Sequence, residues 1–386
     1  MTAAKPFYNP RFILILVLQF LFGLGFSSFF LLPKYLTEVH QADASLIGRV
    51  MAAGPVFAVI SMPILARHVD RLRRHYLLLG AALAMLTASV GYAVLGDVEP
   101  GIYLLRALQG GAFTVYMSTT TALVVELTPP ERFGQALGLL GAANLATNAL
   151  GPAIAEPLAA GQGWRAVFLL SAACSCLAAL GSVALHEPAR AGSDGGVTPR
   201  LNEPRQLGLL YACMVVGIAF GTLVTFYQPL ALAIGITQVR DLFIGYTLTA
   251  LGVRVLFGAW LDRFDRRRVA VISSGAYALV VFATAGLRAG WLFPIGLALG
   301  LAHGALYPVL SALFIEGSDV RVRGALMTYF GGAFNVGVVL STMGFGVLAE
   351  WAGYRSVFIL AGLFGASAVP IILRVVRKSG PRPAYG

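Results

Sequence analysis

Twelve apolar stretches, each with few charged residues, follow one another along the chain. About 20 apolar residues form a helix long enough to cross the roughly 30 Å hydrocarbon core of a bilayer, and each stretch approaches or exceeds that length. Lipid offers the backbone no hydrogen bonds, so a helix is the expected form of every stretch. We therefore predict an all-α membrane protein with twelve transmembrane helices. They are expected at 12–33, 46–66, 76–96, 101–125, 134–158, 164–185, 207–231, 242–261, 269–288, 291–315, 324–348 and 354–376.

A polar segment separates the first six predicted helices from the second six. Residues 186–206 form the longest polar stretch of the chain and are rich in Gly, Pro and charged residues, a composition typical of a linker. We therefore expect a six-helix bundle at 1–185, a linker at 186–206 and a second six-helix bundle at 207–386.

The two halves resemble each other in sequence. A shift of 190 positions places ALVVELTPPERFG (122–134) on ALFIEGSDVRVRG (312–324), and GWRAVFLL (163–170) on GYRSVFIL (353–360). Across 122–172 this alignment gives 14 identities in 51 positions. An internal duplication of six helices is therefore expected, and such repeats are typical of transporters that bind their substrate near the membrane midplane.

Composition supports a membrane protein and excludes other classes. Of the 386 residues, 58% are hydrophobic and 12% charged, against about 25% charged in a soluble domain. A soluble enzyme, a disordered chain and a secreted disulfide scaffold are thereby excluded. Cys174, Cys176 and Cys213 lie in apolar runs and show no metal or redox spacing. No phosphate-binding loop is present, so we do not expect ATP to drive the protein directly. We also expect no metal, no cofactor and no nucleic-acid partner.

The distribution of Lys and Arg predicts the orientation. With both termini inside, the inward segments hold 20 basic residues and the outward loops five, among them Lys34. Cytoplasmic loops carry the excess of basic residues in membrane proteins. We therefore expect both termini in the cytoplasm, and the first apolar run to be a retained helix.

Several polar residues interrupt the apolar runs, and each has two interpretations. Ionisable residues inside a membrane usually face a cavity or a partner, which favours Arg254 and Arg106 as substrate-pathway residues, although Arg106 is close enough to its helix end to reach the interface. Glu156 is either a proton carrier or a residue that meets water. His303 either carries a proton or binds the substrate, or it forms a hydrogen bond between two helices. The remaining predicted lining residues are Asn144, Asn148, Gln19, Tyr227, Gln228, Tyr307 and Asn335.

Asn144 and Asn148 share one helix face, where they could bind a ligand or join two helices. Glu126 and Glu316 end helices 4 and 10 near the basic loops at equivalent positions of the two repeats. We expect them to form salt bridges that act as gates rather than to contact substrate.

Three motifs resemble those of the major facilitator superfamily. GAWLDRFDRRR (258–268) resembles its loop motif, with a degraded first-half copy in ARHVDRLRRH (66–75). RALQGGAF (106–113) resembles its helix 4 motif, and Gly151-Pro152 resembles the core of its antiporter motif. LPKYL (32–36) looks like bacterial efflux-type members. The residues that carry the expected gating motif are Asp70, Arg71, Arg74, Gly258, Asp262, Arg263, Arg266, Glu126, Glu316, Gly151 and Pro152.

This resemblance implies a secondary transporter in which two six-helix bundles rock around a central site. We expect it to be a monomer in the bacterial inner membrane that exports small organic molecules, driven by protons. The spans hold Arg106, Arg254 and His303 but only Glu156 as an acid, so the expected substrates are anionic or zwitterionic. The alternatives are a proton-coupled importer of metabolites and a membrane scaffold or sensor that transports nothing.

Overall fold

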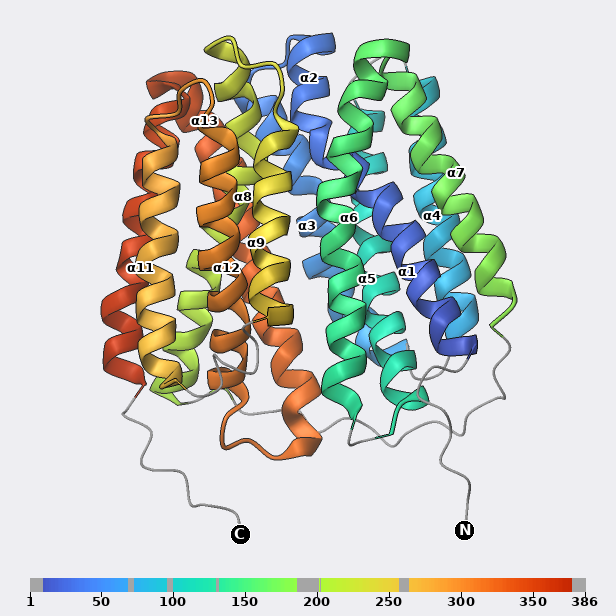
Figure 1. The fold of residues 1–386 in the computed structure, drawn as a ribbon, viewed down its shortest axis with the longest axis vertical. Helices are drawn as coiled ribbons and strands as arrows, with labels where there is room; N and C mark the ends of the chain where they lie inside the picture. Colours follow the sequence, from blue (N-terminus) through green and yellow to red (C-terminus); the bar gives the residue numbers. More distant parts are fainter. Residues whose placement is uncertain are drawn as a thin grey trace. The chain divides into compact units, whose positions relative to one another are not determined.

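A computed structural model describes residues 10–68, 73–95, 100–129, 132–185, 201, 203–256 and 264–376. Within these ranges all regular structure is helical, as Figure 1 shows. The first helices are α1 (Pro10–Ser28), the 3-10 turn η1 (Phe29–Leu31), α2 (Leu32–His40), α3 (Ala44–His68), α4 (Arg74–Val94), α5 (Gly101–Leu127), α6 (Phe133–Gln162) and α7 (Trp164–Val183). They are followed by α8 (Pro204–Ala233), α9 (Arg240–Leu256), α11 (Arg266–Thr284), α12 (Leu292–Ile315) and α13 (Val320–Val375).

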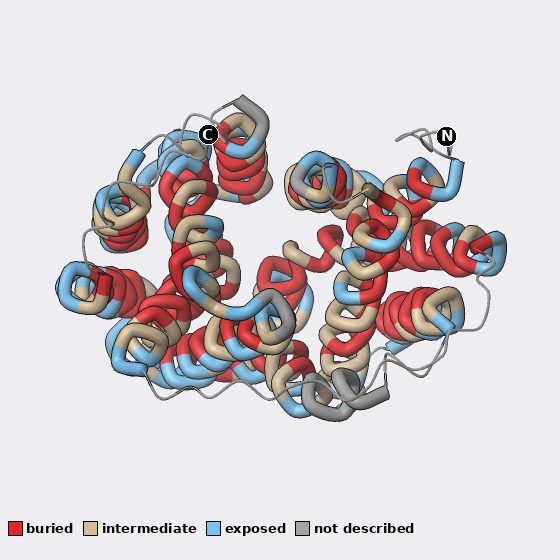
Figure 2. The backbone as a smooth tube through the Cα atoms, turned by 90° about the horizontal axis from the view of Figure 1, so that it is seen from below, coloured by how far each residue is buried: buried red, intermediate tan, exposed pale blue. Residues whose placement is uncertain are grey.

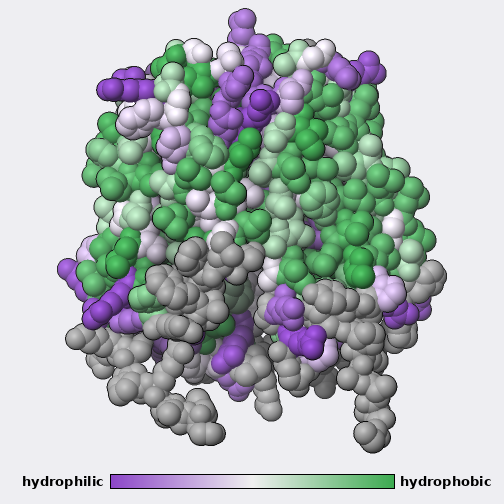
Figure 3. All heavy atoms as spheres, viewed as in Figure 1, coloured by the Kyte–Doolittle hydropathy of each residue, from purple (hydrophilic) through white to green (hydrophobic). Residues whose placement is uncertain are grey.

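The predicted helices correspond to these elements one by one. The segment α1–η1–α2 is the first predicted helix, and α13 contains the last two, separated by non-helical backbone at Gly353. Among the described residues, nine helical segments are long and apolar enough to span a membrane. On the face shown in Figure 3, hydrophobic residues cover the middle and hydrophilic residues gather toward the upper and lower ends.

One boundary differs from the prediction in a way that matters for function. The first helical segment continues to His40 instead of stopping at residue 33, through a 3-10 turn and a second helix with Pro33 in its first turn. Proline is well tolerated there because the first N–H groups of a helix have no intrahelical acceptor. Lys34 is therefore a buried helical residue, not the loop residue that the charge pattern predicted.

The chain forms two compact units. The first consists of Met1–Ala42 and Ala53–Ser193, and the second of Asp43–Ala52 and Asp194–Gly386. Most of the predicted linker lies outside the described residues. In Figure 2 the buried residues lie on the packed faces of the helices.

Close helix packing in each unit depends on small residues. In the first unit α1 packs on α6 and α7, and α4 packs on α5 and α7. A Cβ at Gly151 of α6 would overlap Ser27 of α1, and one at Gly110 of α5 would overlap Gly54 of α3. In the second unit α8 packs on α13 and α9 packs on α12, where a Cβ at Gly300 would overlap Tyr246. Small residues at such crossings are typical of membrane helices.

The internal repeat extends to the backbone. Gly163 joins α6 to α7 with φ of 82°, and Gly353 joins the two parts of α13 with φ of 76°. These two glycines are 190 positions apart, the offset that aligns the two halves. Both combine positive φ with ψ near 165°, a conformation that essentially only glycine adopts. The same one-residue turn therefore recurs in both repeats.

Candidate functional site

Arg106 lies on α5 with its side chain buried in the first unit. Its Nη1 donates to Gln109 Oε1 at 3.1 Å, one helical turn further along. Among the described residues no carboxylate pairs with it, and its Nε has no hydrogen-bond partner. Gln109 Nε2 and the hydroxyl of Tyr92 on α4 are also buried and have no partner in the described part of the chain. This group is a buried cation surrounded by unused donors.

Glu156 of α6 forms a buried ion pair with Lys34 of α2. Lys34 Nζ lies 2.6 Å from Glu156 Oε1, and the two side chains are 8% and 6% exposed. Lys34 Nζ also lies 3.7 Å from a carboxylate oxygen of Glu38, whose side chain is 37% exposed. Lys34 thus lies between a partly exposed carboxylate, that of Glu38, and a buried one, that of Glu156.

Two predicted lining residues of the first unit meet at one methionine. Gln19 Nε2 and Asn144 Nδ2 lie 3.1 and 3.0 Å from Met117 Sδ. Asn148, one turn from Asn144, is half-buried. Beside them, Ser27 Oγ donates to Thr147 O at 2.6 Å. Gly151 is thus part of the packed contact between α1 and α6, and Pro152 follows it as a buried residue.

His303 is the centre of an aromatic cluster in the second unit. Its Nδ1 lies 2.8 Å from the hydroxyl of Tyr246 on α9. Its ring stacks on Phe220 of α8 and on Tyr277 of α11, with both centroid distances 5.5 Å. The rings hold the imidazole in place, while His303 Nε2 and the Tyr277 hydroxyl are buried without hydrogen-bond partners among the described residues. Two free polar groups therefore lie in an otherwise apolar setting.

The structure brings two further predicted residues to this cluster. Tyr307 lies one turn from His303, with ring centroids 5.9 Å apart. Arg254 is exposed in the last turn of α9. It is close enough for its charge to act on Tyr246, His303 and Tyr307.

The remaining predicted lining residues of the second unit lie elsewhere. The Tyr227 hydroxyl donates to Val239 O at 3.0 Å, which ties α8 to the segment before α9. Gln228 is fully buried next to it. Asn335 is half-buried on α13.

The predicted gate residues form ion pairs at equivalent helix ends. In the first unit Arg74, at the start of α4, pairs with Glu126 at the end of α5. In the second unit Arg266, at the start of α11, lies 3.6 Å from Glu316 after α12. The two glutamates are 190 positions apart, so the repeats share this ion pair. The other predicted gating residues of the loop motifs, which are Asp70, Arg71, Gly258, Asp262 and Arg263, lie outside the described residues.

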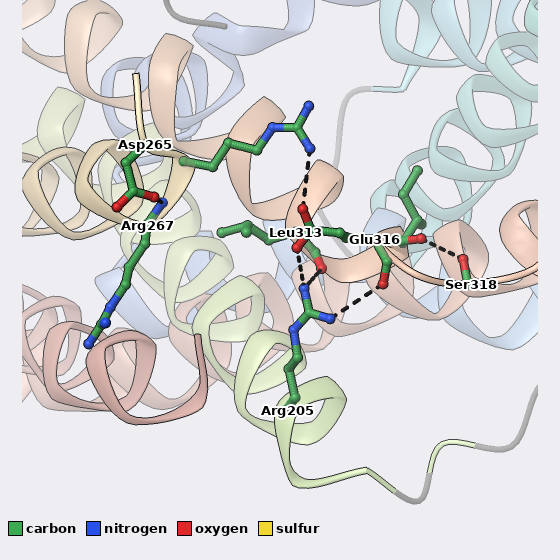
Figure 4. A network of polar contacts seen from close by, with 8 residues as sticks. Arg205, Asp265, Arg267, Leu313, Glu316 and Ser318 are labelled. Atoms are coloured by element: carbon green, nitrogen blue, oxygen red, sulfur yellow. Dashed lines mark hydrogen bonds and ion pairs between the residues drawn. The ribbon is translucent and has the colours of Figure 1, made fainter. Parts of the chain in front are cut away.

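Glu316 has a second partner in Arg205, at the start of α8. Arg205 Nη2 donates to Glu316 Oε2 at 2.6 Å and to Leu313 O at 3.0 Å (Figure 4). Beside them Asp265 accepts from the backbone N–H of Arg267 at 3.0 Å and caps α11. One carboxylate therefore connects the ends of α8, α11 and α12.

Sequence reasoning missed several residues of these groups. Lys34 was assigned to a loop because of its charge. Tyr92, Tyr246 and Tyr277 resemble ordinary core aromatics, and only their buried hydroxyl groups distinguish them in three dimensions. Gln109 could have been found, because it lies three residues after Arg106 in the helix 4 motif and residues three apart share a helix face.

Comparison with known proteins identifies the family. The profile described as Major Facilitator Superfamily matches residues 13–237 and 207–385. The multidrug resistance protein MdtG of Serratia proteamaculans is 28% identical over 375 residues, which cover 89% of this chain and 88% of that protein. MdtG of Salmonella dublin is 25% identical over 375 residues, 91% of either chain.

Solved structures show the same fold at low sequence identity. The nucleoside transporter NupG matches with a TM-score of 0.77 at 13% identity, over 95% of this chain and 99% of that one. The human organic anion transporter MFSD10 matches with a TM-score of 0.68 at 16% identity, over 94% of this chain and all of that one. The all-α fold and the family resemblance are thus confirmed. The chain belongs to the Major Facilitator Superfamily, and it is a multi-pass membrane transporter of small molecules rather than an enzyme.

Proposed function

We propose that this transporter exports small anionic or zwitterionic organic molecules across the bacterial inner membrane in exchange for protons. Alternating access of a binding site to the two sides of the membrane would carry the substrate, with both termini in the cytoplasm. The observation that carries the proposal is the charge balance of the buried side chains described above.

The buried charges leave a net positive value in the first unit. Lys34, Arg106 and Glu156 are its buried charged side chains among the described residues. Lys34 and Glu156 neutralise each other at 2.6 Å, which leaves the guanidinium of Arg106. An isolated charge in a low-dielectric interior is costly without a counter-charge, so a site with this balance favours anions and repels organic cations.

Glu156 is the proposed proton-binding residue. When Glu156 is ionised, Lys34 neutralises it. When Lys34 moves away, a proton can take over that role, because a buried carboxylate without a partner favours its neutral form. Glu38, 3.7 Å from Lys34, offers a second carboxylate on the more exposed side. Exchange between the ion pair and the proton would couple proton entry to movement of α2 against α6.

The direction of transport rests on the relatives. Two relatives that match along most of the chain are named multidrug resistance proteins, and a membrane transporter lowers a drug concentration inside the cell by export. Import of metabolites remains the competing direction, because the fold itself serves solutes moving either way.

The test is accumulation of fluorescent solutes in a bacterial strain that lacks its own efflux pumps. Cells producing this protein are expected to accumulate less of an anionic dye and of a zwitterionic fluoroquinolone, with no change for the cation ethidium. An uncoupler and the Glu156→Gln variant should both abolish the difference. Higher accumulation would mean import, and efflux of ethidium alone would overturn the proposed substrate class.

A further inference from the structure

Arg106 and two neighbouring residues hold three buried hydrogen-bond donors that have no acceptor among the described residues. They are the Arg106 Nε–H, the Gln109 amide and the Tyr92 hydroxyl, and the three residues are 7%, 0% and 4% exposed. A buried donor without an acceptor costs about 1–3 kcal/mol, and more when it is charged. Three such donors on Arg106 and two residues that interact with it therefore require an explanation.

The donors come from two helices and share one charge. Gln109 accepts from Arg106 Nη1 through its Oε1, which leaves its Nε2 to donate elsewhere. Tyr92 of α4 is close enough to interact electrostatically with the guanidinium. On the α3 side, Gly54 places no side chain against Arg106 Nε, and even a Cβ there would lie 3.9 Å from that atom.

The chemistry of this group suits one type of ligand. Guanidinium, amide and phenol groups can all donate to an anion, and the group holds a positive charge that no described carboxylate balances. We infer that Arg106, Gln109 and Tyr92 form a binding site for a small monovalent anion. The anion is either an inorganic halide from solution or the carboxylate of a substrate. The carboxylate source rests on the proposed function, whereas the halide source does not.

The test follows thermal unfolding of the full-length protein in detergent. Sodium gluconate, whose anion is bulky and strongly hydrated, is replaced stepwise by sodium chloride, sodium bromide or sodium benzoate at constant sodium concentration. A ligand that binds the folded state raises the Tm by mass action. We expect a saturable rise on the order of 5 °C with at least one of the three anions.

The Arg106→Met variant distinguishes an anion site from a purely structural arginine. Methionine removes the unbalanced charge and keeps an unbranched side chain, so this variant should lose the anion-dependent rise and unfold at a higher temperature than the wild type in gluconate. Arg165→Met, which removes an exposed arginine at the start of α7, is the matched control and should keep the rise. Tyr92→Phe and Gln109→Leu should weaken anion binding by about tenfold each.

The outcomes identify the source of the anion. A rise with chloride and bromide indicates an inorganic anion, and a rise with benzoate alone indicates a substrate carboxylate. No rise with any of the three in the wild type, or a rise that survives in Arg106→Met, overturns the inference. If Arg106→Met does not fold, Arg106→Lys is used instead. It keeps the charge but loses the Nε donor, so it should weaken anion binding without abolishing it, and unchanged anion affinity in this variant would overturn the inference. Anion binding without anion transport would refute the proposed function and leave this site intact.

Discussion

His303 combines a fixed ring with a free nitrogen. Stacking on Phe220 and Tyr277 and the bond to Tyr246 determine its orientation, whereas Nε2 has no described partner. A residue that only joined two helices would use its polar atoms for that purpose. The free Nε2 therefore supports the predicted role of His303 as a ligand or proton carrier.

Replacing His303 by Phe should separate function from stability. Phenylalanine keeps the stacking, removes the unpartnered Nε2 and leaves the Tyr246 hydroxyl unpaired, so the change in unfolding free energy should stay within about 1 kcal/mol. Transport, measured by dye accumulation, should be lost. Tyr246→Phe removes the same hydrogen bond but keeps Nε2, and should retain measurable transport. Normal transport by His303→Phe would contradict the ligand role.

Replacing Lys34 by Met should destabilise the protein strongly. The substitution leaves Glu156 buried without its counter-charge, and breaking such a pair costs about 3–5 kcal/mol. The double variant Lys34→Met, Glu156→Met removes both charges and should recover most of that loss. Thermal unfolding of the two single variants, the double variant and the wild type measures the coupling. Equal losses in the single and double variants would show that the pair does not act as a unit.

Single residues were partly predictable from the sequence. Arg106, Glu156 and His303 could be identified because a polar residue within an apolar run is conspicuous. Their partners could not. Tyr92 and Tyr246 have the same pattern as core aromatics, and Lys34 lies 122 positions from Glu156, so its charge indicated a loop until the fold brought the two together.

At the scale of the helix, positions and ends were well predicted because a membrane imposes both length and apolarity. The predicted helix end next to Lys34 was wrong, because hydropathy cannot distinguish a charged residue at a helix end from one that forms an ion pair inside a bundle. The points where helices cross could not be predicted from the sequence either. The chain has 45 glycines, and composition does not indicate which of them contact a neighbouring helix.

Two glycines of α6 should respond oppositely to alanine. A Cβ at Gly151 would overlap Ser27 of α1, so Gly151→Ala should lower the free energy of unfolding by about 1–3 kcal/mol. Gly138 is exposed on the same helix with no atom within 4 Å of an added Cβ. Gly138→Ala should raise stability by roughly 0.5–1 kcal/mol, because glycine is unfavourable inside a helix. Similar effects at both positions would argue against the packing of α1 on α6.

For the whole molecule, the sequence indicated two related halves, and the structure repeats their details in each unit. The pairs Arg74–Glu126 and Arg266–Glu316 and the turns at Gly163 and Gly353 recur at equivalent places. The duplication was visible in the sequence because these landmarks occupy turns and helix ends, where few residue types are allowed. The candidate binding groups are not repeated in this way, since each unit holds different buried polar residues.

The orientation of the whole molecule is open to a direct measurement. The excess of 20 basic residues over five predicts that a green fluorescent protein fused after Gly386 will fluoresce in the cytoplasm. Alkaline phosphatase inserted after Arg288, between α11 and α12, should be active because that loop is expected outside. Phosphatase activity at the C-terminus, with none at residue 288, would reverse the predicted topology.

The unbalanced charge of Arg106 has an electrical consequence. Moving one elementary charge across a membrane potential of 100 mV changes the free energy by about 2.3 kcal/mol. A conformational change that carried Arg106 through a quarter of the field would therefore shift the equilibrium by about 0.6 kcal/mol, or nearly threefold. Lys34 and Glu156 contribute nothing to this charge as long as they remain paired. Arg106 would thus make this conformational step sensitive to voltage, and a bound monovalent anion would neutralise the contribution of Arg106.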